Sequence, residues 1–129
     1  MEQLTFAFAS NNKKDLNSEH FGESEYYLIY SISKNESVFL KKIKNTSPEE
    51  KMHSDPKKAK GVANLLKPHK VQVLVNKAFG GNIIKMKQKF VCIVATQNSI
   101  NENIENIKQN FDTIKKLWQQ GEERDYIKL

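Results

Sequence analysis

The stretch "SEHFGESEYYLIY" at residues 18–30 contains the most informative pattern of the chain for its fold and for its candidate site. A histidine in front of Phe-Gly is followed by a run of aromatic and aliphatic residues, which is typical of a β-strand. Gly22 permits backbone conformations that other residues avoid. Loops at strand ends carry binding sites more often than cores do. The pattern therefore predicts a strand over 24–33 and makes His20 either an ordinary loop residue or a ligand.

Strands are also predicted on both sides of this segment. The run "LTFAFAS" at 4–10 is apolar and reaches a polar turn, so it indicates a buried strand. The run "VFLKKI" at 38–43 follows the short turn "KNES" at 34–37. Because a link this short joins neighbouring strands, the second and third strands are expected to form an antiparallel hairpin.

The middle of the chain predicts a helix, a strand and a second helix. Apolar residues recur with helical spacing after Asp55 and Pro56, a capping residue and a first-turn proline, and Pro68 prevents continuation. This helix covers 56–67, and its apolar face comprises Ala59, Val62, Ala63 and Leu66. A β-branched strand at 71–75 leads through the glycine turn 78–82 to a short helix at 83–90.

The last third predicts one strand and one long helix. "FVCIVAT" at 90–96 is the strand, and Ser99 with Glu102 forms a capping box after it. An apolar stripe then runs through residues 100–118, and Gly121 ends the helix. The order β-β-β-α-β-α-β-α implies an α/β protein with a mixed sheet and helices on its faces. We expect a single domain over 1–129, with a core at about 4–118 and a tail at 119–129.

Composition limits the classes of partner. The chain has 21 Lys and Arg against 15 Asp and Glu, a formal net charge of +6, which favours anionic partners. The basic residues are nearly all dispersed lysines, and Arg124 is the single arginine, so a nucleic-acid module is not expected. Cys92 is the single cysteine, which excludes a disulfide framework and fits a cytoplasmic protein. No apolar run has the length of a membrane span, and no basic flank of a secretory signal is present.

Few residues could carry catalysis, so we do not expect an enzyme. The first strand has no carboxylate of the kind that a two-metal nuclease places on core strands. Cys92 lies within an apolar strand and is either a small buried hydrophobe or a soft metal ligand. His53 and His69 fall in predicted loops without chelating spacing, although the fold could bring His53 to His20.

The glycine turn is the second loop of interest. Gly80, Gly81 and Asn82 precede a predicted helix, where backbone N–H groups attract anions. The alternative is that Gly-Gly forms only a routine turn between strand and helix.

The whole pattern resembles the dinitrogenase iron–molybdenum cofactor family. His20, Phe21 and Gly22 match the family's His-Phe-Gly signature, and Tyr27 and Tyr30 fall in the aromatic strand after it. The later helix, the segment "KVQVLVNKAFGGN" and the final helix follow in the family's order, so the resemblance covers about residues 4–118. It implies a ribonuclease-H-like motif: three α/β/α layers around a five-stranded mixed sheet of order 3-2-1-4-5, with strand 2 antiparallel.

The resemblance also implies a non-enzymatic function. Members bind the iron–molybdenum cofactor, its precursor or a related iron–sulfur cluster, and pass it between metallocluster donor and acceptor proteins during nitrogenase maturation. By carry-over, His20 is the candidate metal ligand. Lys13, Lys14 and Lys77 are candidate flanking charges for an anionic cluster, beside the glycine turn.

Two alternatives stay open at this point. One is a protein-interaction domain of the same fold that binds no cluster, because the ligand set is thin. The other is a nucleic-acid-binding module, for which only the net charge of +6 argues. We expect a monomer or a weak homo-oligomer without membrane attachment.

Overall fold

The computed structural model describes residues 3–47 and 56–129. In this part of the chain, six strands form one sheet: β1 (Leu4–Ser10), β2 (Tyr26–Ile32), β3 (Ser37–Lys44), β4 (Val73–Asn76), β5 (Val91–Val94) and β6 (Ile127–Lys128). The helices are α1 (Pro56–Leu66), α2 (Ile83–Lys89), α3 (Ile100–Gln109) and α4 (Phe111–Gln120). Short 3-10 turns lie at η1 (Phe21–Glu23), η2 (Lys67–His69), η3 (Gly80–Asn82) and η4 (Gly121–Glu123).

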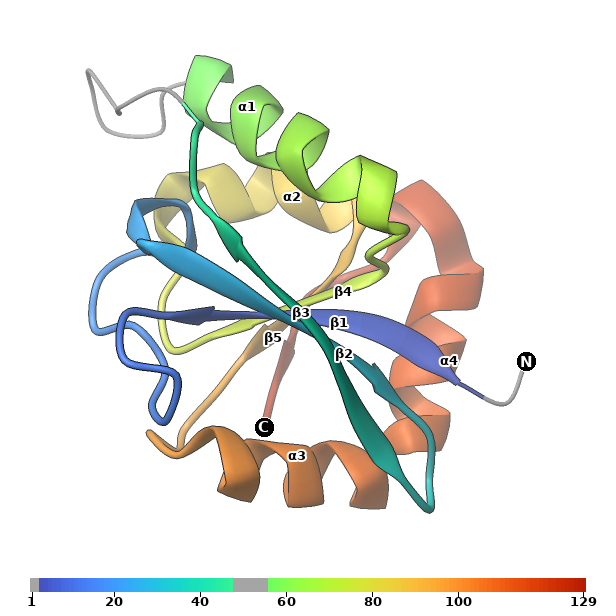
Figure 1. The fold of residues 1–129 in the computed structure, drawn as a ribbon. Coiled ribbons are helices and arrows are strands. Elements are labelled where there is room, and N and C mark those ends of the chain that lie inside the picture. The colour runs from blue at the N-terminus through green and yellow to red at the C-terminus, as the bar shows by residue number, and fades with distance from the viewer. Residues whose placement is uncertain (1–2, 48–55) are drawn as a thin grey trace.

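The sheet has the order β3-β2-β1-β4-β5-β6. Strand β2 is antiparallel to both β1 and β3, whereas β1, β4, β5 and β6 run parallel (Figure 1). The predicted mixed sheet, the hairpin of β2 and β3, and the antiparallel second strand are therefore confirmed. The predicted five strands are joined by a sixth, β6, at the edge beside β5.

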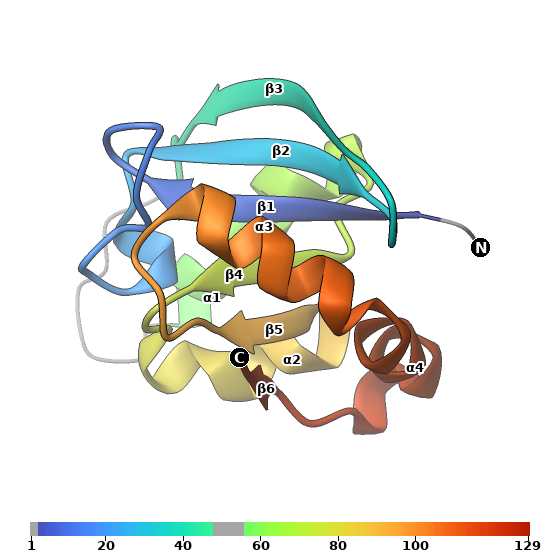
Figure 2. The same cartoon turned by 90° about the horizontal axis from the view of Figure 1, so that it is seen from below.

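Two apolar clusters sit on opposite faces of the sheet, as the alternation in β1 requires. Leu4, Phe6 and Phe8 of β1 face α3 and α4, while Ala7 and Ala9 face α1 and α2. Figure 2 shows α3 on one side of the strands and α1 and α2 on the other. The result is the expected three-layer α/β/α arrangement.

The prediction of one long helix over 100–118 is wrong, because two helices, α3 and α4, cover this stretch. The backbone of Asn110 leaves the helical region (φ −111°, ψ 17°), and its side-chain N–H donates to the Asn106 carbonyl at 2.8 Å. An asparagine amide that bonds the backbone in this way competes with helix propagation. The apolar stripe continues on α4 through Phe111 and Ile114, which pack on the same cluster as Ile107. The stripe therefore predicted the buried face correctly but not the break, after which α4 turns away from α3 (Figure 1).

The predicted tail at 119–129 is part of the folded structure. The Leu129 N–H donates to the Val94 carbonyl at 3.0 Å, and the Thr96 N–H donates to the Leu129 carbonyl at 2.8 Å. Arg124 is 3 % exposed and donates to four carbonyls at the ends of α2 and α4, those of Lys87, Gln88, Leu117 and Trp118. A two-residue strand is too short to show a pattern in sequence, and a single arginine is ordinarily a surface residue.

The structure confirms one of the two predicted helix caps, and the other lies outside the described residues. The Ser99 hydroxyl accepts from the Glu102 N–H at 3.3 Å and caps α3, as predicted. The predicted cap at Asp55 and the predicted loop residue His53 lie outside the described residues. In the described residues, no helix has the length and apolar character that a membrane crossing would need.

Candidate functional site

Three loops meet at the carboxyl ends of the parallel strands β1, β4 and β5. They cover residues 11–20, 77–79 and 95–99. Backbone hydrogen bonds join them: Leu16 N–H to Asn98 O at 2.8 Å, Ile100 N–H to Lys14 O at 2.9 Å, and Phe21 N–H to Ala78 O at 2.8 Å. In open α/β sheets this end of the strands is where ligands bind. The fold therefore brings together the His-Phe-Gly loop and the glycine turn, which lie far apart in sequence.

His20 and Gly80 are in direct contact. A Cβ atom added at Gly80 would lie 2.5 Å from His20 Nδ1 and 2.7 Å from its Cε1, closer than side chains can approach. Gly80 also has φ +70°, a conformation that L side chains rarely adopt. Position 80 therefore needs glycine for two independent reasons, and one of them is the space that the imidazole occupies.

The side chain of Asn76 forms hydrogen bonds with both of these loops. It is the last residue of β4 and fully buried. Its side-chain N–H groups donate to the Glu19 carbonyl at 2.9 Å and to the Ala78 carbonyl at 3.0 Å. Because Glu19 precedes His20 and Ala78 lies two residues before Gly80, one amide fixes the backbone on both sides of the contact. The sequence patterns did not single out Asn76, although a polar residue that ends an apolar strand is a usable signal.

Aromatic rings support the loop on its inner side. The ring of Phe21 stacks on Tyr27 with centroids 4.8 Å apart and on Phe79 with centroids 5.2 Å apart. The Tyr27 hydroxyl donates to the Phe21 carbonyl at 2.8 Å, and burial raises the pKa of this phenol. Phe21 is thus a buried anchor of the loop, and its ring is not available as a surface for ligand.

Gly22 is buried beneath the side chain of Lys58. A Cβ at Gly22 would lie 3.2 Å from Lys58 Cε, and the Gly22 carbonyl accepts from the Asn45 amide at 2.8 Å. Lys58 is only 4 % exposed, and its ammonium donates to the Ser47 hydroxyl at 3.0 Å. The sequence did not single out this lysine, because lysines are ordinarily exposed, although Lys58 lies one helical turn before Val62 and so borders the apolar face.

The predicted flanking lysines lie on the outer surface of the same end. Lys13 and Lys14 are exposed in the loop after β1, and Lys13 has φ +70°. The exposed Lys77 donates from its ammonium to the Asn98 side chain, in the loop after β5. All three cations therefore share the end of the sheet that carries His20.

The rest of the glycine turn is more enclosed than expected. Gly81 and Asn82 belong to η3, directly before α2, and Asn82 is 5 % exposed. The side-chain oxygens of Asn82 and Asn76 are buried and lack a hydrogen-bond partner among the described residues. Gly80 thus has a clear structural role, whereas α2 has only seven residues and offers a weak dipole.

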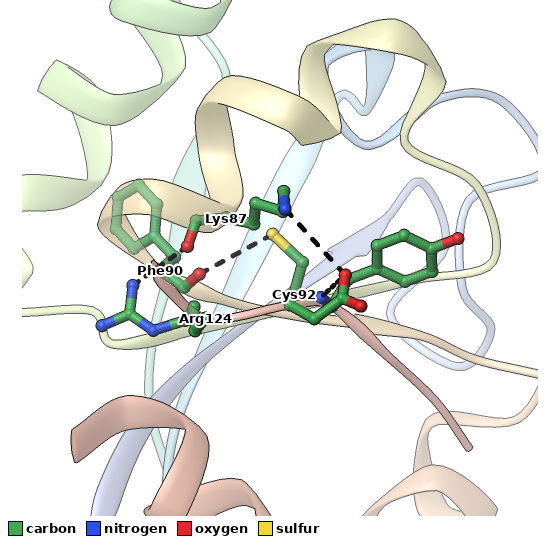
Figure 3. Close-up of polar contacts among 6 residues, drawn as sticks. Lys87, Phe90, Cys92 and Arg124 are labelled. Carbon is green, nitrogen blue, oxygen red and sulfur yellow. Dashed lines mark hydrogen bonds and ion pairs between the residues drawn. The ribbon is translucent and has the colours of Figure 1, made fainter. Parts of the chain in front are cut away.

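Cys92 and His69 lie away from the site. Cys92 is fully buried in β5, its thiol contacts the Phe90 carbonyl at 3.9 Å, and burial raises its pKa to about 12 (Figure 3). A thiol that stays protonated is a poor metal ligand, which supports the interpretation of Cys92 as a small buried hydrophobe. His69 is in η2, before β4, at the other end of the parallel strands from His20.

The donor set does not form a chelating cage. Among residues 3–47 and 56–129, no group of three His, Cys, Asp or Glu side chains is close enough to hold a metal ion. A single metal ion at this site would therefore have His20 as its one imidazole ligand among the described residues. A preassembled cluster supplies its own internal ligands, so one imidazole with lysines at the same end of the sheet fits a cluster better than it fits a single ion.

Comparisons with known proteins concern the family and the fold of the chain. The family model described as dinitrogenase iron–molybdenum cofactor matches residues 2–110. A crystal structure from Methanocaldococcus jannaschii, titled a "putative dinitrogenase", superposes with a TM-score of 0.62 at 22% sequence identity, covering 85% of this chain and 92% of that one. No curated protein matches the chain. The likeness to the solved structure concerns the fold, while the family model covers most of the sequence, so the chain belongs to the dinitrogenase iron–molybdenum cofactor family.

Proposed function

We propose that the protein binds a preassembled metallocluster on the loop that carries His20 and passes it to an acceptor protein without catalysing a reaction. The cargo is the iron–molybdenum cofactor, its precursor or a related iron–sulfur cluster, in keeping with the family. The observation that carries the proposal is the packing of the His20 imidazole on Gly80, at the end of the sheet where three loops meet.

A carrier needs a ligand that is held firmly but bonds its cargo weakly enough to release it. Gly80 and Asn76 fix the position of His20 through contact with the ring and with the loop backbone. A positioned imidazole loses little conformational entropy on binding. A single Fe–N or Mo–N bond can then exchange for a ligand of the acceptor, which a closed cage of cysteines would resist.

Charge supports the same cargo class. Lys13, Lys14 and Lys77 are exposed in the loops after β1 and β4, at the same end of the sheet as His20, and an anionic cluster gains from cations at this end. Because these lysines are exposed, their attraction is screened by salt and contributes mainly to the rate of encounter. We therefore assign attraction to the lysines and the specific bond to His20.

The direct test is anaerobic co-elution. Purified protein is incubated with isolated iron–molybdenum cofactor, and separately with reconstituted iron–sulfur cluster, and each mixture is passed over gel filtration with metal analysis. We expect wild type to carry one of the two clusters and His20→Ala to lose it. His69→Ala is the matched control, because it removes the other described histidine at the opposite end of the strands. Equal loading of wild type and His20→Ala would refute the assignment.

A specific observation also favours a second function, a protein-interaction domain without cargo. The edge strand β3 exposes Val38, Phe39 and Leu40 by 44%, 53% and 54%. Adjacent exposed apolar residues on an unpaired edge are typical of an interaction surface. If neither cluster co-elutes, Phe39→Ser with Leu40→Ser in a pull-down against wild type becomes the deciding experiment, and loss of a captured partner supports this function.

A further inference from the structure

A cleft of about 730 Å³ lies at the amino ends of the parallel strands, opposite the His20 loop. Thr5 at the start of β1, Gln72 before β4 and Phe90 before β5 line its floor. A second hollow of about 460 Å³ between α1 and α2 shares Ala63, Lys89 and Phe90 with it. The volume falls within the range of sites that bind small organic molecules. This end of the molecule has no part in the proposed cluster site.

The lining is strongly cationic. Lys67, Lys70 and Lys89 border the larger cleft, and Lys60 and Lys85 border the smaller one. None of the lining residues is Asp or Glu, and none of these lysines forms an ion pair with another residue in the described parts of the chain. Five lysines without a carboxylate produce a positive potential that an anionic group would neutralise.

The lining also suits a planar ring. Trp118 of α4 is half-buried at the cleft. It packs against the apolar cluster under α3 and α4, and the guanidinium of Arg124 lies over its indole at 5.1 Å from the ring centre, so a base meets only the remaining exposed part of the ring. Phe90 and Val71 also line the cleft, but they are buried and add little apolar surface. The side-chain amides of Gln3 and Asn64 line the same cleft, and amides can donate to and accept from the edge of a heterocycle. Stacking on an aromatic side chain stabilises any planar base.

We infer that this cleft binds a nucleoside phosphate, with the base against Trp118 and the phosphate among Lys67, Lys70 and Lys89. Aromatic surface, amide groups and lysines that form no ion pair within the described residues occur together here, in a cleft whose volume lies within the range of small-molecule sites. The inference is independent of the proposed cluster site, because the two lie at opposite ends of β1, β4 and β5.

The single tryptophan of the chain is a built-in reporter. Adenosine 5′-monophosphate is titrated against the wild-type protein while Trp118 fluorescence is recorded, with adenosine and inorganic phosphate titrated in parallel. We expect a saturable change with the nucleotide and a Kd at least about tenfold weaker for adenosine and for phosphate, because each carries only one half of the recognised structure. Two-dimensional NMR of the same titration should shift the amides of Lys67, Lys70 and Phe90.

Charge-matched variants separate the cleft from the overall charge. Lys67→Gln with Lys70→Gln should weaken nucleotide binding about tenfold and leave adenosine binding unchanged. Lys41→Gln with Lys44→Gln removes the same charge from exposed positions on β3 and should leave the Kd unchanged. Equal weakening by the two pairs, equal affinity for adenosine and nucleotide, or the absence of any saturable change in fluorescence and NMR would each overturn the inference.

Discussion

At the scale of single residues, the contact between His20 and Gly80 organises the site. Sixty positions separate them, so no local pattern could have predicted that an imidazole fills the space above a glycine. The sequence marked both loops, one through its resemblance to the family signature and the other as a glycine turn. It missed two polar residues with structural roles: Asn76, a single polar residue at the end of an apolar strand, and Lys58, which in sequence does not differ from its neighbours Lys57 and Lys60.

Replacing Gly80 tests this contact. Gly80→Ala should lower the free energy of unfolding by roughly 1–3 kcal/mol because of its positive φ. It should also displace the His20 ring, since the added Cβ would lie 2.5 Å from Nδ1. The measurements are thermal unfolding and the NMR signals of the imidazole protons.

Gly121→Ala is the matched control. Gly121 has φ +73°, and a Cβ there would meet nothing within 4 Å. Gly121→Ala should lose stability through backbone strain alone, without a steric clash, and leave the His20 signals unchanged. If Gly80→Ala also left those signals unchanged, the packing of His20 on Gly80 would be disproved.

Burial of Cys92 predicts a dependence on alkaline pH. Its pKa is raised from 9.0 to about 12 in the folded protein, so folding favours the protonated thiol. The sign is therefore a loss of stability as pH rises above 9, by up to about 1.4 kcal/mol per pH unit from this group. Urea unfolding at several pH values should show a shallower alkaline decline for Cys92→Ala.

The same burial predicts low reactivity. At about pH 8 a thiol reagent should label Cys92 only after denaturant is added. Rapid labelling of the native protein would show that the thiol is accessible, and Cys92 would return as a candidate ligand.

At the scale of elements, alternation and helical spacing predicted most of the sheet and the faces that pack on it. They failed where one residue changes the path of the chain. Asn110 divides a continuous apolar stripe into α3 and α4, because its side chain bonds the backbone. Arg124 holds the last residues against α2 and α4 through four carbonyls. Neither effect has a periodic signature, since each depends on a hydrogen bond made by one side chain.

Arg124 should therefore be a major contributor to stability. Hydrogen bonds from a charged donor are worth about 1.5–3 kcal/mol each, and Arg124→Gln removes most of this set. We expect a loss of at least about 3 kcal/mol in the free energy of unfolding by urea. Arg124→Lys should recover only part, because lysine lacks the planar fork.

Lys128 provides the comparison for this effect. It is exposed in β6, so Lys128→Gln should change stability by no more than about 0.5 kcal/mol. An Arg124→Gln variant as stable as Lys128→Gln would mean that the C-terminal segment does not depend on the arginine.

At the scale of the whole molecule, the sheet separates two chemically different ends. The carboxyl ends of β1, β4 and β5 carry a single positioned imidazole and exposed lysines, and the amino ends carry a cleft bordered by lysines and an indole. A nucleotide that binds the second end leaves the first accessible. The two proposals can therefore be tested separately on the same protein.

The proposed function requires that the His20 imidazole bonds the cluster. The most direct measurement is pulsed electron paramagnetic resonance of the cluster-loaded protein, reduced to a paramagnetic state and prepared with ¹⁵N-labelled histidine. If His20 bonds the cluster, a ¹⁵N coupling to the cluster is expected in His69→Ala and should be absent in His20→Ala. A loaded protein without histidine coupling, or with a coupling that survives His20→Ala, would contradict it.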